Sequence, residues 1–229
     1  MSFQIAIDGP VAAGKGTVAK LVAKRLGFLY VDTGAMYRVA ALLAKDNHVS
    51  WEDEDRVSEL VDLAIIEMRN PADGEQDGRQ TTVIVNGQDV SWAIRTEEMS
   101  QGASVVAKLP AVRRVLVKKQ QQIASTQDVV MEGRDITFRV LPNAQLKIYL
   151  DADEEIRAKR RHQELQARGQ DLSYHQILRD LKKRDAQDRE RDTDPLQIVA
   201  NAWVLDTTSL SIDEVVSAIQ QKVGQINRN

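Results

Sequence analysis

The chain contains no cysteine, and only three histidines occur among its 229 residues. The absence of cysteine excludes disulfide frameworks, thiolate catalysis and cysteine-ligated zinc sites. The histidines, at positions 48, 162 and 175, are scattered along the sequence. Any metal ion is therefore expected to have oxygen ligands.

Long apolar runs and a strong net charge are also missing. No segment approaches the roughly 18 consecutive apolar residues of a membrane span, and the first residues hold neither a basic leader nor an apolar segment. We therefore expect a cytoplasmic protein with no membrane partner. The net charge of −3 gives no general affinity for nucleic acid, so anion binding is expected only at local basic clusters. A composition of 42% hydrophobic and 28% charged residues predicts one large globular domain, or one domain with an insertion.

One stretch near the start, IAIDGPVAAGKGTVAKLVAKRLG, fits two different glycine-rich patterns. One is the G-x-x-x-x-G-K of a phosphate-binding P-loop, and the other is the G-x-G-x-x-A of a dinucleotide-binding fingerprint. The apolar run before it predicts a buried strand that ends at Gly9, the first glycine of the P-loop pattern. In a dinucleotide-binding fold the strand would end at Gly14 instead. The strand therefore favours the P-loop, although Asp32 lies where a ribose-binding acid would be expected.

The expected P-loop has an unusual ending. In a P-loop, successive backbone N–H groups and a helix N-terminus converge on phosphate oxygens, and the lysine adds a positive charge. A hydroxyl residue that approaches Mg²⁺ usually follows the lysine, but here Gly16 follows Lys15 and the hydroxyl comes at Thr17. This G-K-G-T ending resembles that of the nucleoside monophosphate kinases. The next helix is expected to run to Arg25, with Gly27 as its stop.

Apolar runs alternate with helical patterns along the rest of the chain. Strands are expected at residues 3–8, 28–32, 129–132, 146–151 and 203–206, and two helices are expected to be capped by Ser50 and Ser211. This alternation predicts an α/β protein with a parallel sheet flanked by helices. Residues 65–95 break the pattern with two β-rich runs around Asn86 and Gly87, a strong hairpin signal. We expect a small antiparallel insert there, which is a candidate substrate domain.

Charged motifs follow several of these predicted elements. The segments D-T-G-A-M-Y-R at 32–38 and E-G-R-D at 132–135 follow strands, and ligands of open α/β sheets bind at the carboxyl ends of strands. Both segments are therefore expected near the P-loop. Arg184, Asp188 and Arg191 have the spacing of one face of a late helix. From spacing alone, a solvated face with salt bridges is the simpler interpretation of these three residues.

With these motifs identified, nearly the whole chain resembles the bacterial cytidylate kinases. The matching segments are I-D-G-P-x-x-A-G-K-G-T at 7–17, D-T-G-A-M-Y-R at 32–38, V-S-W-A-I-R-T at 90–96, G-R-D at 133–135, R-D-x-x-D-x-x-R at 184–191 and L-D-T-T-x-L-S-I-D-E-V at 205–215. The resemblance implies transfer of the γ-phosphoryl group of ATP to CMP or dCMP, with Mg²⁺ as cofactor, by a monomer. It also implies an α/β fold, a three-layer P-loop kinase core with a five-stranded parallel sheet, at residues 1–39 and 104–229 with a lid at about 154–170. The NMP-binding domain would lie at 40–103 and include the insert at about 65–95.

Carried over position by position, the resemblance implies roles for individual residues. The ATP phosphates would be held by Gly9, Pro10, Val11, Ala12, Ala13, Gly14, Lys15, Gly16 and Thr17, together with Arg160 of the lid. Thr17 would reach the metal directly or through a water molecule. CMP would be bound by Thr33, Arg38, Ser104, Arg113, Arg134, Asp135, Asp188 and Arg191, with Ser104, Arg113 and Asp135 at the cytosine edge. Catalysis would involve Lys15, Arg134, Arg184 and Arg191, because phosphoryl transfer depends on alignment and on cations around the transferred group.

The chain departs from the family pattern beside the expected CMP site. After G-R-D-I the family usually continues with Gly-Thr, whereas this chain has Thr137, Phe138 and Arg139. Either Phe138 packs outward and leaves the site intact, or it alters access to the acceptor.

Three other functions are considered. A GTPase switch requires D-x-x-G and N-K-x-D, and the sequence has neither. A P-loop kinase for a different small acceptor stays open, because the arginines indicate only that the acceptor is anionic. A regulatory ATP-binding protein without catalytic activity is the third alternative.

Overall fold

The computed structural model describes residues 2–75, 77–167 and 169–226 of the chain. It consists of two compact units. Unit 1 comprises Met1–Gln4 and Gly27–Met131, and unit 2 comprises Ile5–Leu26 and Glu132–Asn229. Residues 1, 76, 168 and 227–229, which fall within the domain and lid ranges expected from the sequence, lie outside the described residues.

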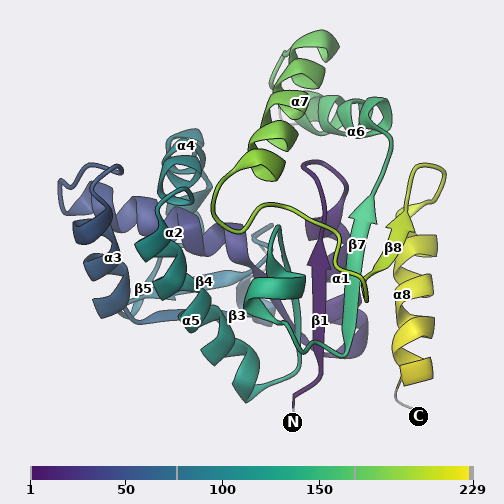
Figure 1. Ribbon diagram of the computed structural model, residues 1–229, viewed down its shortest axis with the longest axis horizontal. Helices are drawn as coiled ribbons and strands as arrows, with labels where there is room; N and C mark the ends of the chain where they lie inside the picture. Colours follow the sequence, from purple (N-terminus) through teal and green to yellow (C-terminus); the bar gives the residue numbers. More distant parts are fainter. Residues whose placement is uncertain (1, 76, 168, 227–229) are drawn as a thin grey trace. The chain divides into compact units, whose positions relative to one another are not determined.

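A five-stranded sheet has the strand order β2-β6-β1-β7-β8. Its strands β1, β7 and β8 are labelled in Figure 1. Its members are β1 (Gln4–Asp8), β2 (Leu29–Asp32), β6 (Val129–Gly133), β7 (Leu146–Asp151) and β8 (Trp203–Asp206). Strand β7 pairs in parallel with β1, where Ile5 lies opposite Leu146, and with β8, where Ile148 lies opposite Trp203. These are the five predicted strands, and the α/β fold class with its five-stranded parallel sheet is confirmed.

Unit 2 has four α-helices among its described residues: α1 (Lys15–Leu26), α6 (Glu154–Ala167), α7 (Tyr174–Glu190) and α8 (Ile212–Ile226). Helix α1 packs against α8, and α6 packs against α7. Gly27 follows α1 with a φ of 73°, as its predicted role as a stop requires. At the start of α8, the Ser211 hydroxyl accepts from the N–H of Glu214, and the Glu214 carboxylate accepts from the N–H of Ser211. This reciprocal capping box confirms Ser211 as the predicted N-cap.

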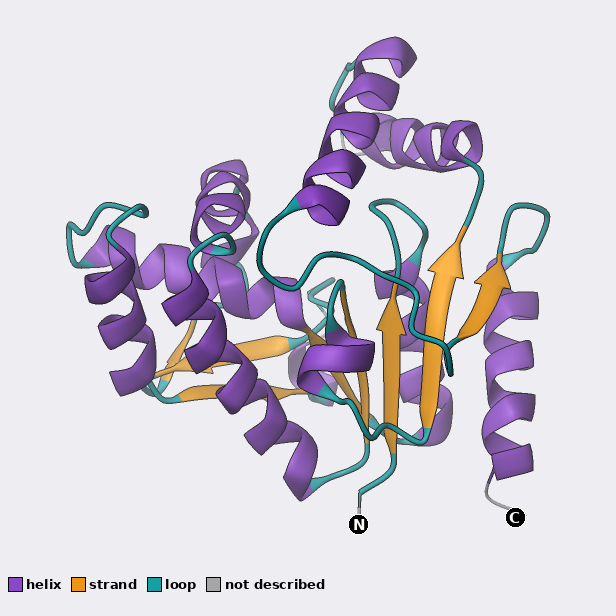
Figure 2. Cartoon of the chain, in the orientation of Figure 1, coloured by secondary structure: helices purple, strands orange, loops and turns teal. Residues whose placement is uncertain are grey.

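Unit 1 combines helices with the small sheet, as Figure 2 shows by colour. Its α-helices are α2 (Thr33–Asp46), α3 (Glu54–Leu63), α4 (Glu97–Val106) and α5 (Pro110–Thr126), and its second sheet holds β3 (Ile66–Arg69), β4 (Thr82–Val85) and β5 (Gln88–Asp89). Both pairs of neighbouring strands in this sheet are antiparallel. Asn86 and Gly87, between β4 and β5, have φ values of 51° and 82°, as in the hairpin turn expected for Asn-Gly. The predicted antiparallel insert is therefore confirmed.

The expected cap of α3 is wrong. Helix α3 begins at Glu54, and its N-cap is Asp53, whose carboxylate accepts a hydrogen bond from the N–H of Arg56. The Ser50 hydroxyl instead accepts from the N–H of Glu52 within the preceding turn. Both residues are good N-caps, and the aspartate lies closer to the apolar face of the helix at Val57 and Val61.

A short π-helix at Ile136–Val140 follows β6 and was not expected from the sequence. The carbonyl of Asp135 accepts from the N–H groups of Arg139 and Val140, and the carbonyl of Ile136 accepts from the N–H of Leu141. Such single turns are rare and occur often at functional sites.

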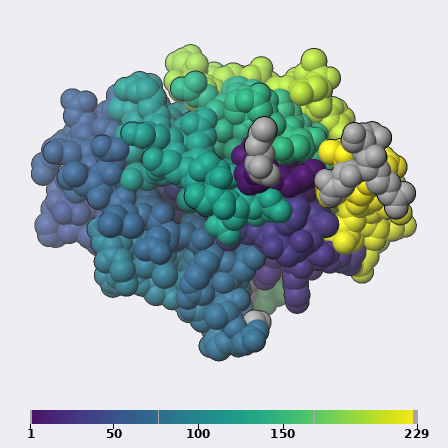
Figure 3. Space-filling model, turned by 90° about the horizontal axis from the view of Figure 1, so that it is seen from below, coloured from purple at the N-terminus to yellow at the C-terminus, as the bar shows by residue number. Residues whose placement is uncertain are grey.

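The buried side chains are mainly aliphatic, and they include every residue of Ile5–Ile7 and Val129–Met131. In the space-filling view, the blue and teal residues of unit 1 form a continuous surface (Figure 3). No helix among the described residues is both long enough and apolar enough to cross a membrane.

Candidate active site

The P-loop joins β1 to α1 and has the backbone conformation of a phosphate-binding loop. Ala12 and Gly14 both have positive φ, at 58° and 88°, and α1 begins immediately afterwards at Lys15. Gly9 is required for a different reason, because a Cβ there would lie 2.1 Å from the carbonyl oxygen of Leu150 on β7. The loop is therefore shaped by its neighbouring strand as well as by its own glycines. Its N–H groups at the start of α1 suit an anion.

Lys15 is buried, and its Nζ donates a hydrogen bond to the Pro10 carbonyl at 2.7 Å. Burial and the nearby Arg134 lower its pKa to about 7, although Glu132, Asp188 and Asp8 oppose the shift. An added anion would favour the charged ammonium and reverse part of this shift. The lysine is thus held inside the loop at the position where a phosphate charge would stabilise it most.

Asp8, at the end of β1, anchors the π-helix. One carboxylate oxygen accepts from the N–H of Ile136 at 2.9 Å, and the other accepts from the N–H and the hydroxyl of Thr137 at 2.8 and 2.7 Å. Burial raises the pKa of Asp8 to about 6, although the bonds from Thr137 and Ile136 act in the opposite direction. The sequence motifs indicate no role for Asp8, which ends the first predicted strand.

Thr137 therefore helps to hold the Asp8 carboxylate in this chain. Its buried hydroxyl donates to Asp8, a contact that glycine, the usual family residue at this position, lacks. Phe138 is half-buried and Arg139 is exposed. The effect of Phe138 on the acceptor site stays a prediction.

Arg134 and Asp188 form an ion pair in unit 2, with Nε of Arg134 2.7 Å from the Asp188 carboxylate. Burial alone would raise the pKa of Asp188, but Arg134 and the charges of Arg184 and Arg191 lower it. The pair lies within electrostatic range of Lys15, since both residues influence the lysine pKa. The structure thus gathers Lys15, Arg134 and Asp188 into one charged cluster.

Arg184 and Asp188 lie on α7 and Arg191 directly follows its last residue, and the charges of both arginines act on the Asp188 carboxylate. Helix α7 ends at Glu190, and Arg191 is the C-cap with an extended backbone conformation (ψ 143°). Its guanidinium donates to the carbonyl of Asp194, which holds the chain in a turn away from the helix axis. Arg184 stays on α7 and is exposed.

In unit 1, two residues predicted to bind the acceptor nucleotide, Thr33 and Arg38, lie in the first turns of α2. Asp32 caps this helix by accepting from the N–H of Ala35, Thr33 is its first residue, and Arg38 lies one turn further along. The Asp32 carboxylate is 3.5 Å from Nη1 of Arg38 and 3.1 Å from Nη1 of Arg95. Arg95, in the 3₁₀-turn Ala93–Arg95, was not singled out from the sequence.

Arg38 provides a test of whether an anion fits this end of α2. Its Nη1 is buried and lies 3.5 Å from the Asp32 carboxylate, but it makes no hydrogen bond to any other described residue. A buried guanidinium N–H without an acceptor is costly, and a phosphate oxygen would satisfy it. The residues present therefore fit an anionic ligand.

Arg113 and Ser104, both predicted at the cytosine edge, differ in their surroundings. Arg113 on α5 is buried, donates to the Ala107 carbonyl at 3.2 Å and stacks over the Tyr37 ring at 5.7 Å. Ser104 on α4 is exposed, and its hydroxyl donates to the Ser100 carbonyl in the same helix. Asp135, the third predicted residue of this group, is buried in unit 2 at the N-cap of the π-helix.

Arg160 on α6 contacts the loop after β8. It donates to the hydroxyl of Thr207 at 3.1 Å and to the carbonyl of Thr207 at 2.7 Å. This places the guanidinium against the C-terminal part of unit 2, where the Thr207 bonds hold it in one orientation.

Thr17, the residue predicted to reach a metal ion, offers a hydroxyl oxygen. No group of three or more carboxylate or histidine residues suited to a metal occurs among the described residues. Thr17, in the first turn of α1, is exposed. This arrangement fits Mg²⁺, which usually takes one or two protein ligands and completes its shell with phosphate oxygens and water.

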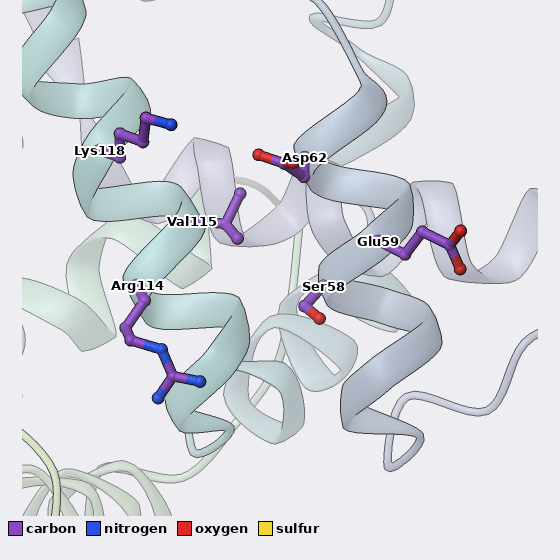
Figure 4. A pocket seen from close by; sticks show the side chains of 6 residues that line it. All are labelled: Ser58, Glu59, Asp62, Arg114, Val115 and Lys118. Carbon is purple, nitrogen blue, oxygen red and sulfur yellow. The ribbon is translucent and has the colours of Figure 1, made fainter.

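A surface pocket of about 450 Å³ lies between α3 and α5 (Figure 4). Its lining consists of Ser58, Glu59, Asp62, Arg114, Val115 and Lys118. None of these is a predicted site residue.

The family model described as cytidylate kinase matches residues 5–225. The chain belongs to the cytidylate kinase family. A cytidylate kinase from Lactobacillus gasseri is 46% identical over 227 residues, which cover 99% of this chain and 96% of the relative. A cytidylate kinase from Bacillus subtilis is 46% identical over 226 residues, with 99% and 98% of the two chains covered. The resemblance seen in the sequence is confirmed, and the protein is a nucleoside monophosphate kinase.

A solved structure of an uncharacterised protein from Eubacterium ventriosum is similar in fold. Its TM-score is 0.54 at 10% sequence identity, and the match covers 97% of this chain and 99% of that one. At this identity the likeness supports the fold alone.

Proposed function

We propose that this member of the cytidylate kinase family transfers the γ-phosphoryl group of ATP to CMP and dCMP, and that Mg²⁺ assists the transfer. The observation that carries the proposal is the cluster of Lys15, Arg134 and Asp188 at the P-loop. Phosphoryl transfer needs cations and alignment rather than a nucleophilic side chain, and this cluster offers both.

The P-loop residues Gly9 to Thr17 would hold the ATP phosphates. The N–H groups at the start of α1 would donate to phosphate oxygens, and Lys15 would exchange its bond to Pro10 for one to the transferred phosphoryl group. Thr17 would hold Mg²⁺, which neutralises the charge on the phosphates when it is bound.

The acceptor nucleotide would be bound by the residues that the family resemblance assigns to CMP. Arg38 has the unsatisfied buried donor that a CMP phosphate would accept from, and Thr33, Arg134 and Arg191 would add to that subsite. Arg113, with Ser104 and Asp135, would face the cytosine ring. Arg160 and Arg184 would approach the ATP phosphates from the α6–α7 region. The domain limits given above, the monomeric state and the cytoplasmic location belong to the same proposal.

A coupled assay of ADP release tests this function. ATP and Mg²⁺ are supplied with CMP, dCMP, UMP, AMP and neutral acceptors in turn, and Mg²⁺ is then replaced by a chelator. We expect turnover with CMP and dCMP that is lost without the metal. Turnover with a different acceptor and none with CMP would contradict the proposed substrate, and ATP binding without turnover on any acceptor would contradict catalysis.

A further inference from the structure

Helices α6 and α7 pack directly on the P-loop within unit 2. Ala158 and Leu165 of α6 and Ile177 and Leu181 of α7 form a buried apolar cluster, and Val11 and Ala12 of the loop pack against it. Figure 1 shows the two helices side by side beyond the carboxyl ends of β1 and β7. The packing of this helix pair therefore constrains the conformation of the P-loop at Val11 and Ala12.

A buried ion pair lies at the same contact. Nη1 of Arg157 is 2.6 Å from the Asp185 carboxylate, and the two side chains are 3% and 5% exposed. Asp185 belongs to the R-D-x-x-D-x-x-R segment, and Arg157 opens the basic run of α6. Neither residue has a role in the function proposed above. A buried ion pair costs desolvation of both charges, so its contacts need an explanation beyond stability.

Both partners hold the main chain of Val11. The other oxygen of Asp185 accepts from the N–H of Val11 at 3.1 Å, and Nη1 of Arg157 donates to the carbonyl of Val11 at 3.0 Å. Nε of Arg157 donates to the carbonyl of Ala152, which fixes the guanidinium at the base of α6. While these bonds exist, both polar main-chain groups of Val11 are used by the helix pair.

One peptide unit links this ion pair to Lys15. The N–H of Val11 and the carbonyl of Pro10 belong to the same planar peptide group. Its N–H donates to Asp185, and its carbonyl accepts from Nζ of Lys15. Rotation of this plane would change both bonds together, so the orientation set by Asp185 also sets where Lys15 rests.

We propose that Asp185 and Arg157 are positioning residues that fix the Pro10–Val11 peptide and thereby keep the P-loop shaped for the ATP phosphates. Without them the peptide can rotate and direct the Pro10 carbonyl toward the space where phosphate oxygens bind, which repels the ligand. The pair acts on the ATP side, since both partners bond the main chain of Val11 in the P-loop. The inference rests on the proposed function in one respect, namely that ATP occupies the loop.

Two variants and a matched control test the proposal. Asp185→Asn keeps an acceptor for the Val11 N–H but breaks the ion pair. The double variant Arg157→Met, Asp185→Leu removes both buried charges, so that no unpaired charge prevents folding. The control is Glu154→Gln with Lys182→Met, because Glu154 and Lys182 form an exposed ion pair at 3.2 Å between the same two helices.

Each protein is first checked by thermal unfolding. The dissociation constant of ATP is then measured by calorimetry, kcat and KM are measured for both nucleotides, and amide exchange is measured at Val11. We expect the double variant to bind ATP about 10-fold more weakly or worse, with faster exchange at Val11 and with KM for CMP changed less than about twofold. The control should match the wild type in all of these.

The outcomes separate the two proposals. The positioning role would be overturned if the double variant weakened the binding of ATP and of CMP equally, or if it folded and bound ATP as the wild type does. The same loss of ATP affinity in the control would also overturn it. If neither variant folds, the pair is purely structural and the inference is also overturned. If the wild type fails to phosphorylate CMP while the double variant still loses ATP affinity, the proposed function fails and the positioning role stands.

Discussion

The buried carboxyl of Asp8 makes the stability of this protein depend on pH in an unusual direction. Burial raises its pKa from 3.8 to about 6 in the folded state, although the hydrogen bonds from Thr137 and Ile136 counteract the shift. The proposed change is Asp8→Asn, which removes the titration at nearly constant volume. The amide also places an NH₂ group opposite the N–H of one partner, so the variant is expected to be less stable at every pH.

The size and sign of the effect follow from the two pKa values. Between pH 3.8 and about pH 6 the folded state binds the Asp8 proton more tightly than the unfolded state. The stabilisation that this proton gives to the folded state is complete below the unfolded pKa of 3.8. It is lost as the pH rises through the folded pKa of about 6. A difference of about 2 units at about 1.4 kcal/mol per unit amounts to about 3 kcal/mol. The advantage of the wild type over Asp8→Asn should shrink by about 2–2.5 kcal/mol from pH 4 to pH 7, because pH 4 already lies above the lower pKa.

Urea unfolding of both proteins at several pH values measures this difference, and titrations shared by the two proteins cancel. Asp206 provides the control, because its carboxylate also accepts from the N–H and hydroxyl of one threonine, Thr208, but it is exposed. The hydroxyl bond from Thr208 lowers the pKa of Asp206, so the advantage over Asp206→Asn should grow as the pH rises. An Asp8 difference that stays constant over this range, or that grows like the control, would refute the reasoning.

The fold could be predicted from the sequence because its signals are local. Each strand of the five-stranded sheet lies in a short apolar run, the hairpin is set by Asn86 and Gly87, and α1 ends where Gly27 takes a positive φ. These features depend on neighbouring residues only. The one wrong cap, Ser50 in place of Asp53, arose because two good capping residues lie within one turn of each other.

The charged contacts of the site could not be predicted in the same way. The bond from Ile136 to Asp8 joins residues 128 positions apart in the sequence, and the bond from Val11 to Asp185 joins residues 174 positions apart. No periodicity in the sequence links such distant residues. The low pKa of Lys15 likewise depends on burial by the completed fold. Resemblance to a family named the residues of the site, but it gave no role to Asp8, Arg157 or Asp185, whose contacts emerge only in three dimensions.

The remaining predictions concern the two nucleotide sites and the packing of unit 1. Lys15→Ala should fold normally and lower kcat by about 10²-fold, because it removes the cation matched to the transferred phosphoryl group, and near-normal kcat would rule out the P-loop role. Gly102→Ala should lower the free energy of unfolding by about 1–3 kcal/mol, because its Cβ would lie 2.7 Å from the Trp51 ring; Gly224→Ala, with nothing within 4 Å, is the control and should be neutral or slightly stabilising. If Gly102→Ala is equally neutral, α4 can shift without cost. Arg113→Met should mainly affect the choice of base, since a site that reads cytosine needs a donor for N3 and an acceptor for the amino group. With UMP each mismatch costs about 1–3 kcal/mol, so the wild type should favour CMP by about 10-fold to 10³-fold in kcat/KM, and the variant should lose most of that preference while ATP binding is retained. An unchanged ratio of kcat/KM for CMP and UMP would mean that Arg113, buried over Tyr37, supports the packing of α5 and that another residue reads the base.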